Sequence, residues 1–263
     1  RVMDSSHIVI CGGGICGSFA AIVFAKNGFK VSIYESKNHH EMFEEGGRSY
    51  NITLTERGLK PLRLVPGLEE RVLSMGVKCY GRQVYSNNSS FWMPYSSRRD
   101  YLLSINRNSL NRLLFETMFE TENISVYLGH KCMDGDLMNG RLEFLNCDAK
   151  RIIVNASVIF GVDGTWSTIK KLMNRSTPMS MQQRVSNLTH KELRSSNFPG
   201  DNNCLHLWPK GNHMLLAMPN PDKSFSVSIF AKPELFRDLN VEHFNKNFPE
   251  IANYIERLED NLK

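Results

Sequence analysis

Residues 7–17, HIVICGGGICG, run from an apolar strand through a glycine-rich turn into a helix. In the spacing Gly12-x-Gly14-x-x-Gly17, the first glycine permits a tight turn and the second lets the backbone approach a pyrophosphate. The third lets the helix pack closely on the strand. The N-terminus of such a helix also presents free N–H groups to phosphate oxygens. The stretch therefore predicts the first strand and helix of a dinucleotide-binding sheet, against the alternative of a glycine-rich turn without a ligand.

Two carboxylates follow at positions where such a sheet binds its ligand. Glu35 ends a second predicted strand, residues 31–35, and is expected to accept hydrogen bonds from the adenosine ribose hydroxyls. An acid there disfavours a 2′-phosphate, so the resident nucleotide is not expected to be NADP. Asp163 ends an apolar strand, residues 158–162, expected at the centre of the parallel sheet, with a helix starting near Thr165. This late Asp-Gly favours flavin over nicotinamide as the resident cofactor; alternatively, Asp163 only caps the next helix.

Composition narrows the class of protein. The 263 residues are 41% hydrophobic and 22% charged, as in ordinary globular proteins. The net charge of +5 comes from Lys and Arg scattered among acids, so no nucleic-acid partner is expected. The six cysteines form no Cys-x-x-Cys pair, so no metal site is expected. Without a secretory signal or an apolar run of about 18–20 residues, the chain as given is expected to be soluble, reduced and cytoplasmic.

The remaining pattern alternates between helical and strand periodicity and suggests two interleaved domains. The expected elements, in chain order, are a glycine loop (46–55), a helix capped by Thr55 (55–64), a hairpin (80–86 with 90–95), a strand (101–105), an amphipathic helix (107–120), four strands of an antiparallel sheet (183–193, 204–208, 213–219, 224–231) and two helices (233–237, 241–259). Arg48, in the glycine loop, either faces solvent or neutralises a phosphate. Residues 1–77 and 98–180 are expected to form the nucleotide-binding domain. Residues 78–97 and 181–263 are expected to form a substrate-binding sheet domain, with a cleft between the two.

Together these segments resemble the single-component flavoprotein aromatic hydroxylases, and within them the branch that acts on kynurenine. The family-wide marks are the glycine turn, Glu35 and the segment GVDGTWSTIK at 161–170. The marks of the branch are GRSYNI at 47–52, GRQVY at 81–85, MPY at 93–95, LSINRNSLN at 103–111, LHLWPK at 205–210, AMPN at 217–220 and KSF at 223–225. The resemblance implies an α/β fold, in which an FAD-binding, Rossmann-like (GR2-type) parallel sheet is interleaved with an antiparallel substrate-binding sheet.

The resemblance also implies the chemistry and the residues that serve it. It implies hydroxylation of L-kynurenine to 3-hydroxykynurenine in tryptophan degradation, with bound FAD, NADPH and O2 and with no catalytic side chain. Arg82 would pair with the substrate carboxylate, and Tyr95 would be its hydrogen-bonding companion. The cofactor-binding residues would be Gly12, Gly14, Gly17, Glu35, Arg48, Thr53, Arg107 and Asp163.

The chain departs from the family in several places. Lys170 stands where arginine is usual, and Tyr50 and Thr53 replace more usual residues. A third motif, Gly-Asp before a proline- and glycine-rich turn, has no counterpart after Asp163. In the family, a C-terminal region completes the pocket and, in eukaryotic members, anchors the enzyme to the mitochondrial outer membrane. This region, too, has no counterpart in the sequence given. Three readings stay open: part of a kynurenine hydroxylase, a hydroxylase of another aromatic compound, or a shortened non-catalytic relative.

Overall fold

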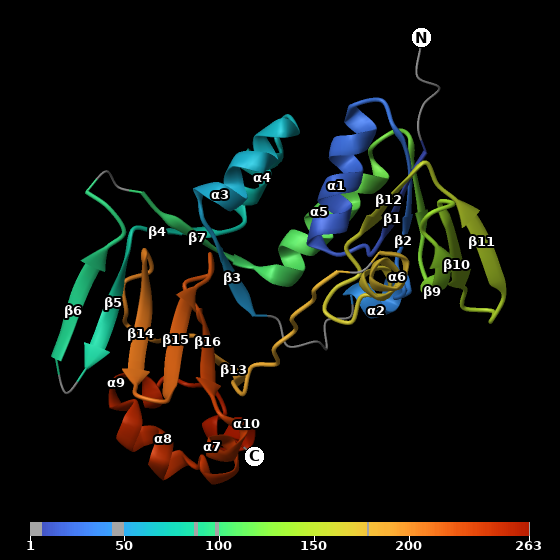
Figure 1. Ribbon diagram of the computed structural model, residues 1–263. Coiled ribbons are helices and arrows are strands. Elements are labelled where there is room, and N and C mark those ends of the chain that lie inside the picture. The colour runs from blue at the N-terminus through green and yellow to red at the C-terminus, as the bar shows by residue number, and fades with distance from the viewer. Residues whose placement is uncertain (1–6, 44–49, 87–88, 98–99, 178, 263) are drawn as a thin grey trace. The chain divides into compact units, whose positions relative to one another are not determined.

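Strands assemble into four separate sheets in the computed structural model, which describes residues 7–43, 50–86, 89–97, 100–177 and 179–262 (Figure 1). The chain divides into two compact units. Unit 1 comprises residues 1–47 and 110–182, and unit 2 comprises residues 48–109 and 183–263. The domain borders expected from the sequence, at residues 77, 97 and 180, stay a prediction.

Unit 1 is built on a parallel sheet of order β12-β1-β2-β8. Its strands are β1 His7–Cys11, β2 Lys30–Tyr34, β8 Ile124–Tyr127 and β12 Val158–Gly161. The expectation that the strand before Asp163 is central is wrong for the described residues. There β12 pairs with β1 alone, so Val158 and Phe160 are 47% and 37% exposed.

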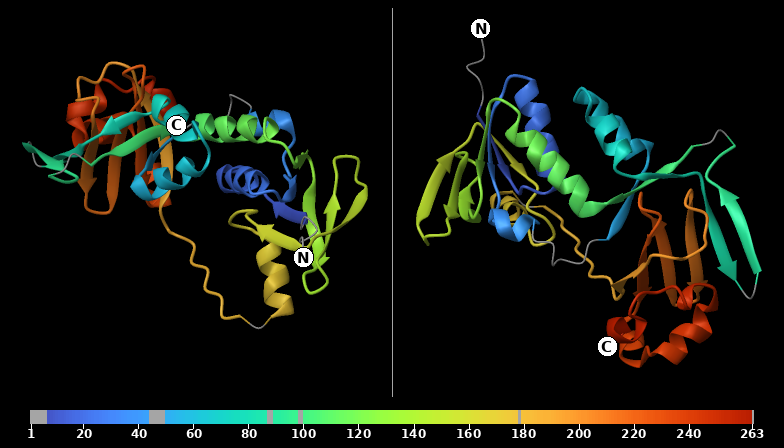
Figure 2. Two further views of the ribbon diagram at one scale, coloured as in Figure 1. Left: turned by 90° about the horizontal axis from the view of Figure 1, so that it is seen from above. Right: turned by 180° about the vertical axis from the view of Figure 1, so that it is seen from behind.

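The two faces of this parallel sheet are covered differently. Helices α1 (Ile15–Lys26) and α5 (Arg107–Phe119) lie on one face, and a three-stranded antiparallel sheet lies on the other (Figures 1 and 2). That sheet comprises β9 Lys131–Asp136, β10 Arg141–Leu145 and β11 Arg151–Asn155. Tyr34 stacks on Phe144 at a centroid distance of 4.1 Å, which ties β2 to β10. The short helix α2 (His39–Phe43) also belongs to unit 1.

Helix α6 (Thr168–Ser176) begins later than the sequence indicated. Ser167 is the N-cap, and its Oγ accepts a hydrogen bond from Lys170 N at 2.9 Å. The preceding residues form the turn that follows Asp163. Helix α5, by contrast, spans nearly the predicted range of 107–120.

Unit 2 is built on a six-stranded sheet of order β13-β16-β15-β14-β5-β6. Its strands are β5 Gly81–Ser86, β6 Ser89–Pro94, β13 Thr189–Ser195, β14 Cys204–Lys210, β15 His213–Pro219 and β16 Phe225–Ala231. Neighbouring strands are antiparallel except β14 and β5, which are parallel. The predicted hairpin and sheet are confirmed. However, β13 starts at Thr189 rather than 183, because Thr189 pairs with Ala231, where β16 ends.

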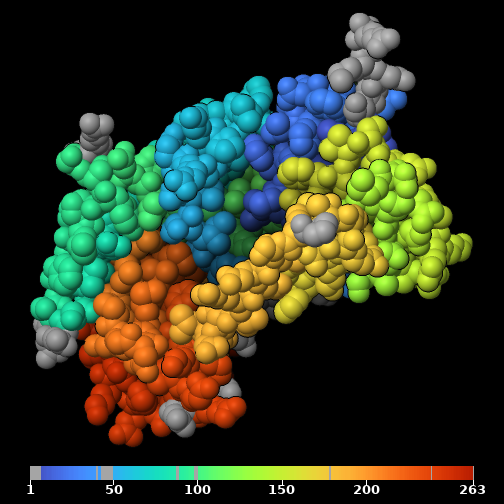
Figure 3. Space-filling view, viewed as in Figure 1, coloured from blue at the N-terminus to red at the C-terminus, as the bar shows by residue number. Residues whose placement is uncertain are grey.

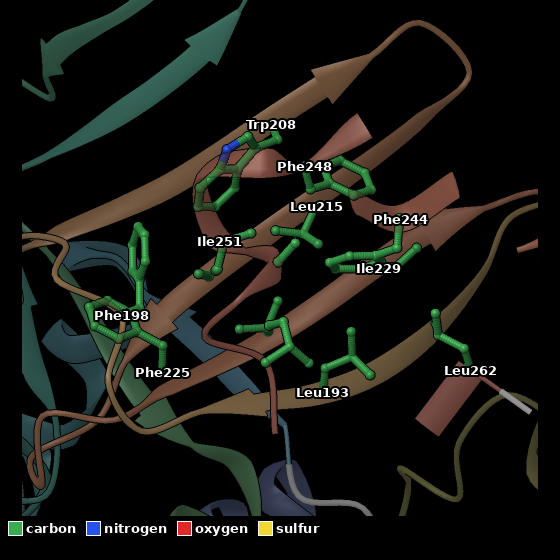
Figure 4. Packing of buried hydrophobic residues seen from close by; sticks show 14 of the residues in the cluster. Leu193, Phe198, Trp208, Leu215, Phe225, Ile229, Phe244, Phe248, Ile251 and Leu262 are labelled. Carbon is green, nitrogen blue, oxygen red and sulfur yellow. The ribbon is translucent and has the colours of Figure 1, made fainter. Parts of the chain in front are cut away.

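One face of this sheet is sealed by the C-terminal helices. These are α7 Pro233–Asp238, α8 Val241–Asn247, α9 Pro249–Ala252 and α10 Leu258–Leu262. Trp208, Leu215 and Ile229 point from the strands toward Phe248 and Ile251 in a shared core (Figure 4). The single helix expected over 241–259 is interrupted, because Pro249 lacks a backbone N–H and disfavours a helical residue before it. Phe248 accordingly has φ −133° and ψ 53°.

A smaller sheet of order β3-β7-β4 completes unit 2. Its strands are β3 Asn51–Leu54, β7 Leu102–Asn106 and β4 Val77–Cys79. The helix predicted over 55–64 is split into α3 Glu56–Leu59 and the 3-10 helix η1 Lys60–Leu64, with Pro61 at the start of η1. Thr55 is the N-cap residue, although its side chain makes no capping hydrogen bond. Helix α4 (Leu68–Ser74) follows.

Asn51 joins the smaller sheet to the larger one through a buried polar network. Its Nδ2 lies 3.1 Å from Ser104 Oγ, 3.2 Å from the Pro219 carbonyl oxygen and 2.8 Å from Asn220 Oδ1. Its Oδ1 accepts from Ser226 Oγ at 3.2 Å. Asn51 is 3% exposed, so water cannot replace these partners if the amide is removed.

We therefore expect Asn51→Ala to lower the free energy of unfolding by about 2–4 kcal/mol, because several buried polar groups lose a partner. Chemical denaturation of each variant, followed by tryptophan fluorescence, would measure the change. Thr53→Ala is the matched control, since Thr53 is an exposed residue of the same strand. Equal stabilities of the two variants would contradict this account of the network.

His206 provides a pH-sensitive element of the unit 2 core. It is 1% exposed, and its Nε2 lies 3.0 Å from the Asp201 carbonyl oxygen, which can only accept. Nε2 therefore carries the proton, and Nδ1 accepts from the Tyr85 hydroxyl at 3.0 Å. Burial lowers the pKa of His206 below its usual value.

Because the pKa of His206 is lower in the folded chain than in the unfolded chain, the unfolded chain binds the proton first as pH falls. We expect stability to decrease from about pH 7 to about pH 5, by at most about 1.4 kcal/mol per pH unit from this group. Burial also lowers the pKa of His213, so the wild type must be compared with His206→Gln at each pH. If both proteins lose stability with the same slope, His206 is not the cause.

Candidate functional site

The glycine turn of unit 1 is held by close backbone contacts. Gly12 has φ +107°, and a Cβ built on it would lie 2.4 Å from the Val162 carbonyl oxygen. A Cβ on Gly17 would lie 1.8 Å from the Gly12 carbonyl oxygen. Gly14, in contrast, has no atom within 4 Å of its Cβ position. Two of the glycines are thus required by packing, and the third faces open space at the N-terminus of α1.

Glu35 lies directly against this turn. Its Oε2 accepts from Gly13 N at 2.6 Å, and its Oε1 accepts from Lys37 N at 2.9 Å. These bonds fix the carboxylate at the carboxyl end of β2, beside the carboxyl end of β1. Each oxygen keeps acceptor capacity for the hydroxyls of a ribose.

Asp163 caps helix α6 and also contacts the glycine turn. Its Oδ2 accepts from Thr168 N at 2.6 Å and from Ile169 N at 3.2 Å, and its Oδ1 accepts from Ser167 Oγ. The Cβ position of Gly12 is 3.0 Å from Asp163 Cα, so the two segments touch. The capping role that the sequence left as an alternative is therefore present, and it does not exclude a ligand beside the cap.

The geometry of unit 1 fits a dinucleotide. Gly12, Gly14, Gly17, Glu35 and Asp163 gather where β1, β2 and β12 end, which is where parallel α/β sheets bind nucleotides. The open space at Gly14 lies over the free N–H groups of the first turn of α1, and no acidic residue occupies that turn.

Unit 2 contains a separate pocket of about 540 Å³ on the sheet face opposite the helices. Strand alternation produces it, because Leu207, Leu216 and Ser228 face the pocket while their neighbours Trp208, Leu215 and Ile229 face the core. The pocket is lined by Tyr50, Asn51, Ile52, Thr53, Arg82, Tyr95, Leu102, His190, Glu192, Leu205, Leu207, Leu216, Met218, Ser228 and Phe230. It is thus mainly apolar, with a few charged and polar groups.

Arg82 and Tyr95 meet in this pocket. Arg82 is on β5, within the hairpin β5–β6 whose surface is visible in green shades at the left of Figure 3. Tyr95 follows β6, and its backbone N donates to the Tyr80 carbonyl oxygen at 3.1 Å. Burial raises the pKa of Tyr95 to about 12, although the charge of nearby Arg82 opposes this shift. The hydroxyl therefore keeps its proton at neutral pH and can donate beside the guanidinium.

Glu192 is a pocket residue that the sequence analysis missed. Its side chain is 9% exposed, and both carboxylate oxygens lie 2.8 Å from Ser228 Oγ on the neighbouring strand. His190 Nε2 is 3.7 Å from Glu192 Oε1. The alternation of side chains along β13 could have indicated it. Leu193 lies in the core, so its neighbour Glu192 points to the other face of the sheet.

Two further residues that are expected to bind the cofactor, Arg107 and Thr53, belong to unit 2. Arg107 begins α5 in unit 2, with its N donating to the Tyr50 carbonyl oxygen at 3.1 Å and its guanidinium 5.8 Å from the Tyr50 ring centroid. Thr53 lines the unit 2 pocket. Arg48 lies outside the described residues. Their contacts with a cofactor stay a prediction.

Among the described residues, no three His, Cys, Asp or Glu side chains gather in a way that could hold a metal ion. No helix described in the structure is long and apolar enough to cross a membrane.

Comparison with known proteins relates the chain to flavoproteins. Residues 5–239 match the FAD binding domain family. Relatives named kynurenine 3-monooxygenase include those of Sus scrofa, 31% identical over 96% of this chain and 57% of that protein, and Drosophila melanogaster, 31% identical over 92% and 54%. That of Cytophaga hutchinsonii is 28% identical over 94% and 58%. The chain thus spans little more than half the length of these relatives.

Solved structures share the fold at lower identity. PqsL of Pseudomonas aeruginosa, in complex with 2-aminobenzoylacetate, gives a TM-score of 0.76 at 16% identity over 95% of this chain and 72% of that chain. The tetrameric form of 2-methyl-3-hydroxypyridine-5-carboxylic acid oxygenase gives 0.77 at 18% identity over 95% and 66%. The family match and the curated relatives confirm the resemblance inferred from the sequence, and the solved structures confirm the predicted fold class.

Proposed function

Because this chain belongs to the FAD binding domain family, we propose that it carries FAD and serves the hydroxylation of L-kynurenine to 3-hydroxykynurenine, with NADPH and O2 as co-substrates. The names of its relatives support this substrate. The observation that carries the substrate class is the pocket of unit 2, where Arg82 and Tyr95 adjoin an apolar cavity. An aromatic ring bearing one carboxylate matches such a lining.

We propose that the residues of unit 1 hold the adenine dinucleotide part of FAD. The glycine turn would receive the pyrophosphate, Glu35 the adenosine ribose, and Asp163 a more distant part of the cofactor. In unit 2, Arg107 and Thr53 would contact the cofactor, as would Arg48. When bound, FAD supplies the redox and oxygen-transfer chemistry, so no nucleophilic side chain is required.

The substrate would be oriented by charge at one end and by apolar contact along its ring. The planar guanidinium of Arg82 can make two parallel charge-assisted hydrogen bonds to a carboxylate, and Tyr95 can donate a third. Leu205, Leu216 and Phe230 would surround the ring and exclude water. The carboxylate of Glu192 makes its end of the pocket unfavourable for a second anionic group.

The visible absorption spectrum of the chain, recorded after FAD is added and free FAD is removed by desalting, tests the proposal first. Retained flavin bands, followed by NADPH oxidation that L-kynurenine stimulates with formation of 3-hydroxykynurenine, are expected. Retained flavin with stimulation by another aromatic acid alone would indicate a different hydroxylase. A colourless protein would contradict FAD binding by this chain and point to a non-catalytic relative.

A further inference from the structure

The pocket of unit 2 has a second polar end, several strands away from Arg82. There Glu192 on β13 pairs with Ser228 on β16, and both carboxylate oxygens lie 2.8 Å from Ser228 Oγ. His190 Nε2 lies 3.7 Å from Glu192 Oε1. The Glu192 side chain is 9% exposed and belongs to the pocket lining. Its carboxylate is therefore fixed by the neighbouring strand at the wall of the cavity.

Aromatic rings surround this end of the pocket. The ring of His190 contacts those of Tyr50 and Phe230, in both cases at a centroid distance of 5.8 Å, and all three residues line the cavity with Glu192. Among the described lining residues, Arg82 and Glu192 are the only ones of the types Arg, Lys, Asp and Glu. A carboxylate beside aromatic rings suits an aromatic amine, because it accepts from the N–H group while the rings contact the rest of the molecule.

The spacing of the two polar ends matches a ligand that has a different group at each end. Arg82 is on β5, and β14, β15 and β16 lie between that strand and β13. Four strand intervals place the backbones of Arg82 and Glu192 about 19 Å apart, and the two side chains shorten this gap. Leu207 and Leu216 lie between them on the same face of the sheet. An aromatic ring can thus rest on the leucines while its polar groups reach both ends.

We propose that Glu192 accepts a hydrogen bond from the ring amino group of the substrate and thereby selects 2-aminophenyl compounds. The assignment rests on the proposed function, in which Arg82 holds the substrate carboxylate. The α-ammonium group of L-kynurenine is one carbon from that carboxylate, so it stays at the Arg82 end. The ring amine turns one N–H to the neighbouring ketone and has the other available for Glu192. Ser228 is a positioning residue, because its hydroxyl holds the carboxylate.

A suitable ligand pair isolates the ring amine. The compound 2-amino-4-oxo-4-phenylbutanoate keeps the carboxylate, the α-ammonium group, the ketone and the ring of L-kynurenine but lacks the ring amine. A hydrogen bond to a carboxylate is stronger than one between neutral groups, so we expect the wild-type chain to bind L-kynurenine about tenfold more tightly than this analogue.

Calorimetric titration of the full chain with both ligands tests the proposal. In Glu192→Gln we expect the preference to fall to about twofold, with the affinity for the analogue nearly unchanged, because the amide oxygen is a weaker acceptor. In Ser228→Ala we expect about threefold, since the carboxylate remains but is no longer held. Glu70→Gln is the matched control, because Glu70 is an exposed carboxylate of unit 2 outside the pocket lining. It should keep the full preference.

The outcomes separate this proposal from the proposed function. A Glu192→Gln protein that keeps the wild-type preference would overturn the role of Glu192. So would a wild-type chain that binds both ligands equally while Arg82→Met weakens both, and in that case the carboxylate assignment stands. A wild-type chain that binds neither ligand would overturn the proposed substrate and, with it, this proposal. The measurements on the wild type do not depend on whether any variant folds, and circular dichroism checks the fold of each variant.

Discussion

Gly12→Ala is expected to destabilise the protein by about 3–5 kcal/mol and to abolish retention of FAD. The added Cβ meets the Val162 carbonyl oxygen at 2.4 Å and Asp163 Cα at 3.0 Å, which are backbone atoms that cannot rotate away. The residue must also keep φ +107°, a conformation that L-residues other than glycine rarely adopt. Relief would require the carboxyl ends of β1 and β12 to separate.

Gly14→Ala separates the packing role from the binding role. Its Cβ meets nothing within 4 Å, so we expect a loss of stability of only about 1 kcal/mol, mainly because alanine is a poorer N-cap than glycine. The same methyl group would occupy the space where a pyrophosphate approaches α1, so FAD retention should still fall strongly.

Denaturation curves and flavin absorbance after desalting measure both variants side by side. A Gly12→Ala protein as stable as the wild type would contradict the described contacts of the turn. A Gly14→Ala protein that retains FAD like the wild type would instead contradict the proposal that this turn binds the cofactor, without bearing on the fold.

Local chemistry explains what could be predicted from the sequence. The glycine turn between β1 and α1 and the start of α5 depend on residues close together in the chain, and the structure has both where the sequence predicts them. The hairpin β5–β6 is equally local, since its two strands adjoin the turn that joins them.

Features that depend on distant partners could not be predicted in the same way. No element was predicted within residues 121–157, whose strands β9–β11 are defined by pairing with one another and by covering the parallel sheet. The sequence pattern also could not show that β12 has one neighbour in the described sheet, because an apolar strand has the same pattern at the centre of a sheet and at its edge. Glu192 was missed because strand alternation shows two faces without saying which one lines a pocket.

Arg82→Met is expected to weaken binding of L-kynurenine by about 100-fold or more, equivalent to about 3 kcal/mol, without destabilising the protein. Methionine preserves much of the aliphatic bulk but removes the two parallel charge-assisted hydrogen bonds proposed for the carboxylate. Arg82 is exposed, so its loss leaves no buried partner unsatisfied. The affinity of Arg82→Lys for L-kynurenine should lie between that of the wild type and that of Arg82→Met, because an ammonium group retains the charge but not the planar fork.

Arg63→Met is the matched control for Arg82→Met. Arg63 is an exposed arginine of the same unit, it pairs with Glu56 and Glu69, and it lies outside the pocket lining. Calorimetric titration with L-kynurenine measures the affinity without requiring turnover, and denaturation measures stability in the same samples. Because the charge change is identical in the two variants, a loss confined to Arg82→Met must come from the pocket and not from the overall field of the protein. Equal weakening in both variants would mean that the pocket of unit 2 does not bind the carboxylate, and the substrate assignment would then lose the observation on which it rests.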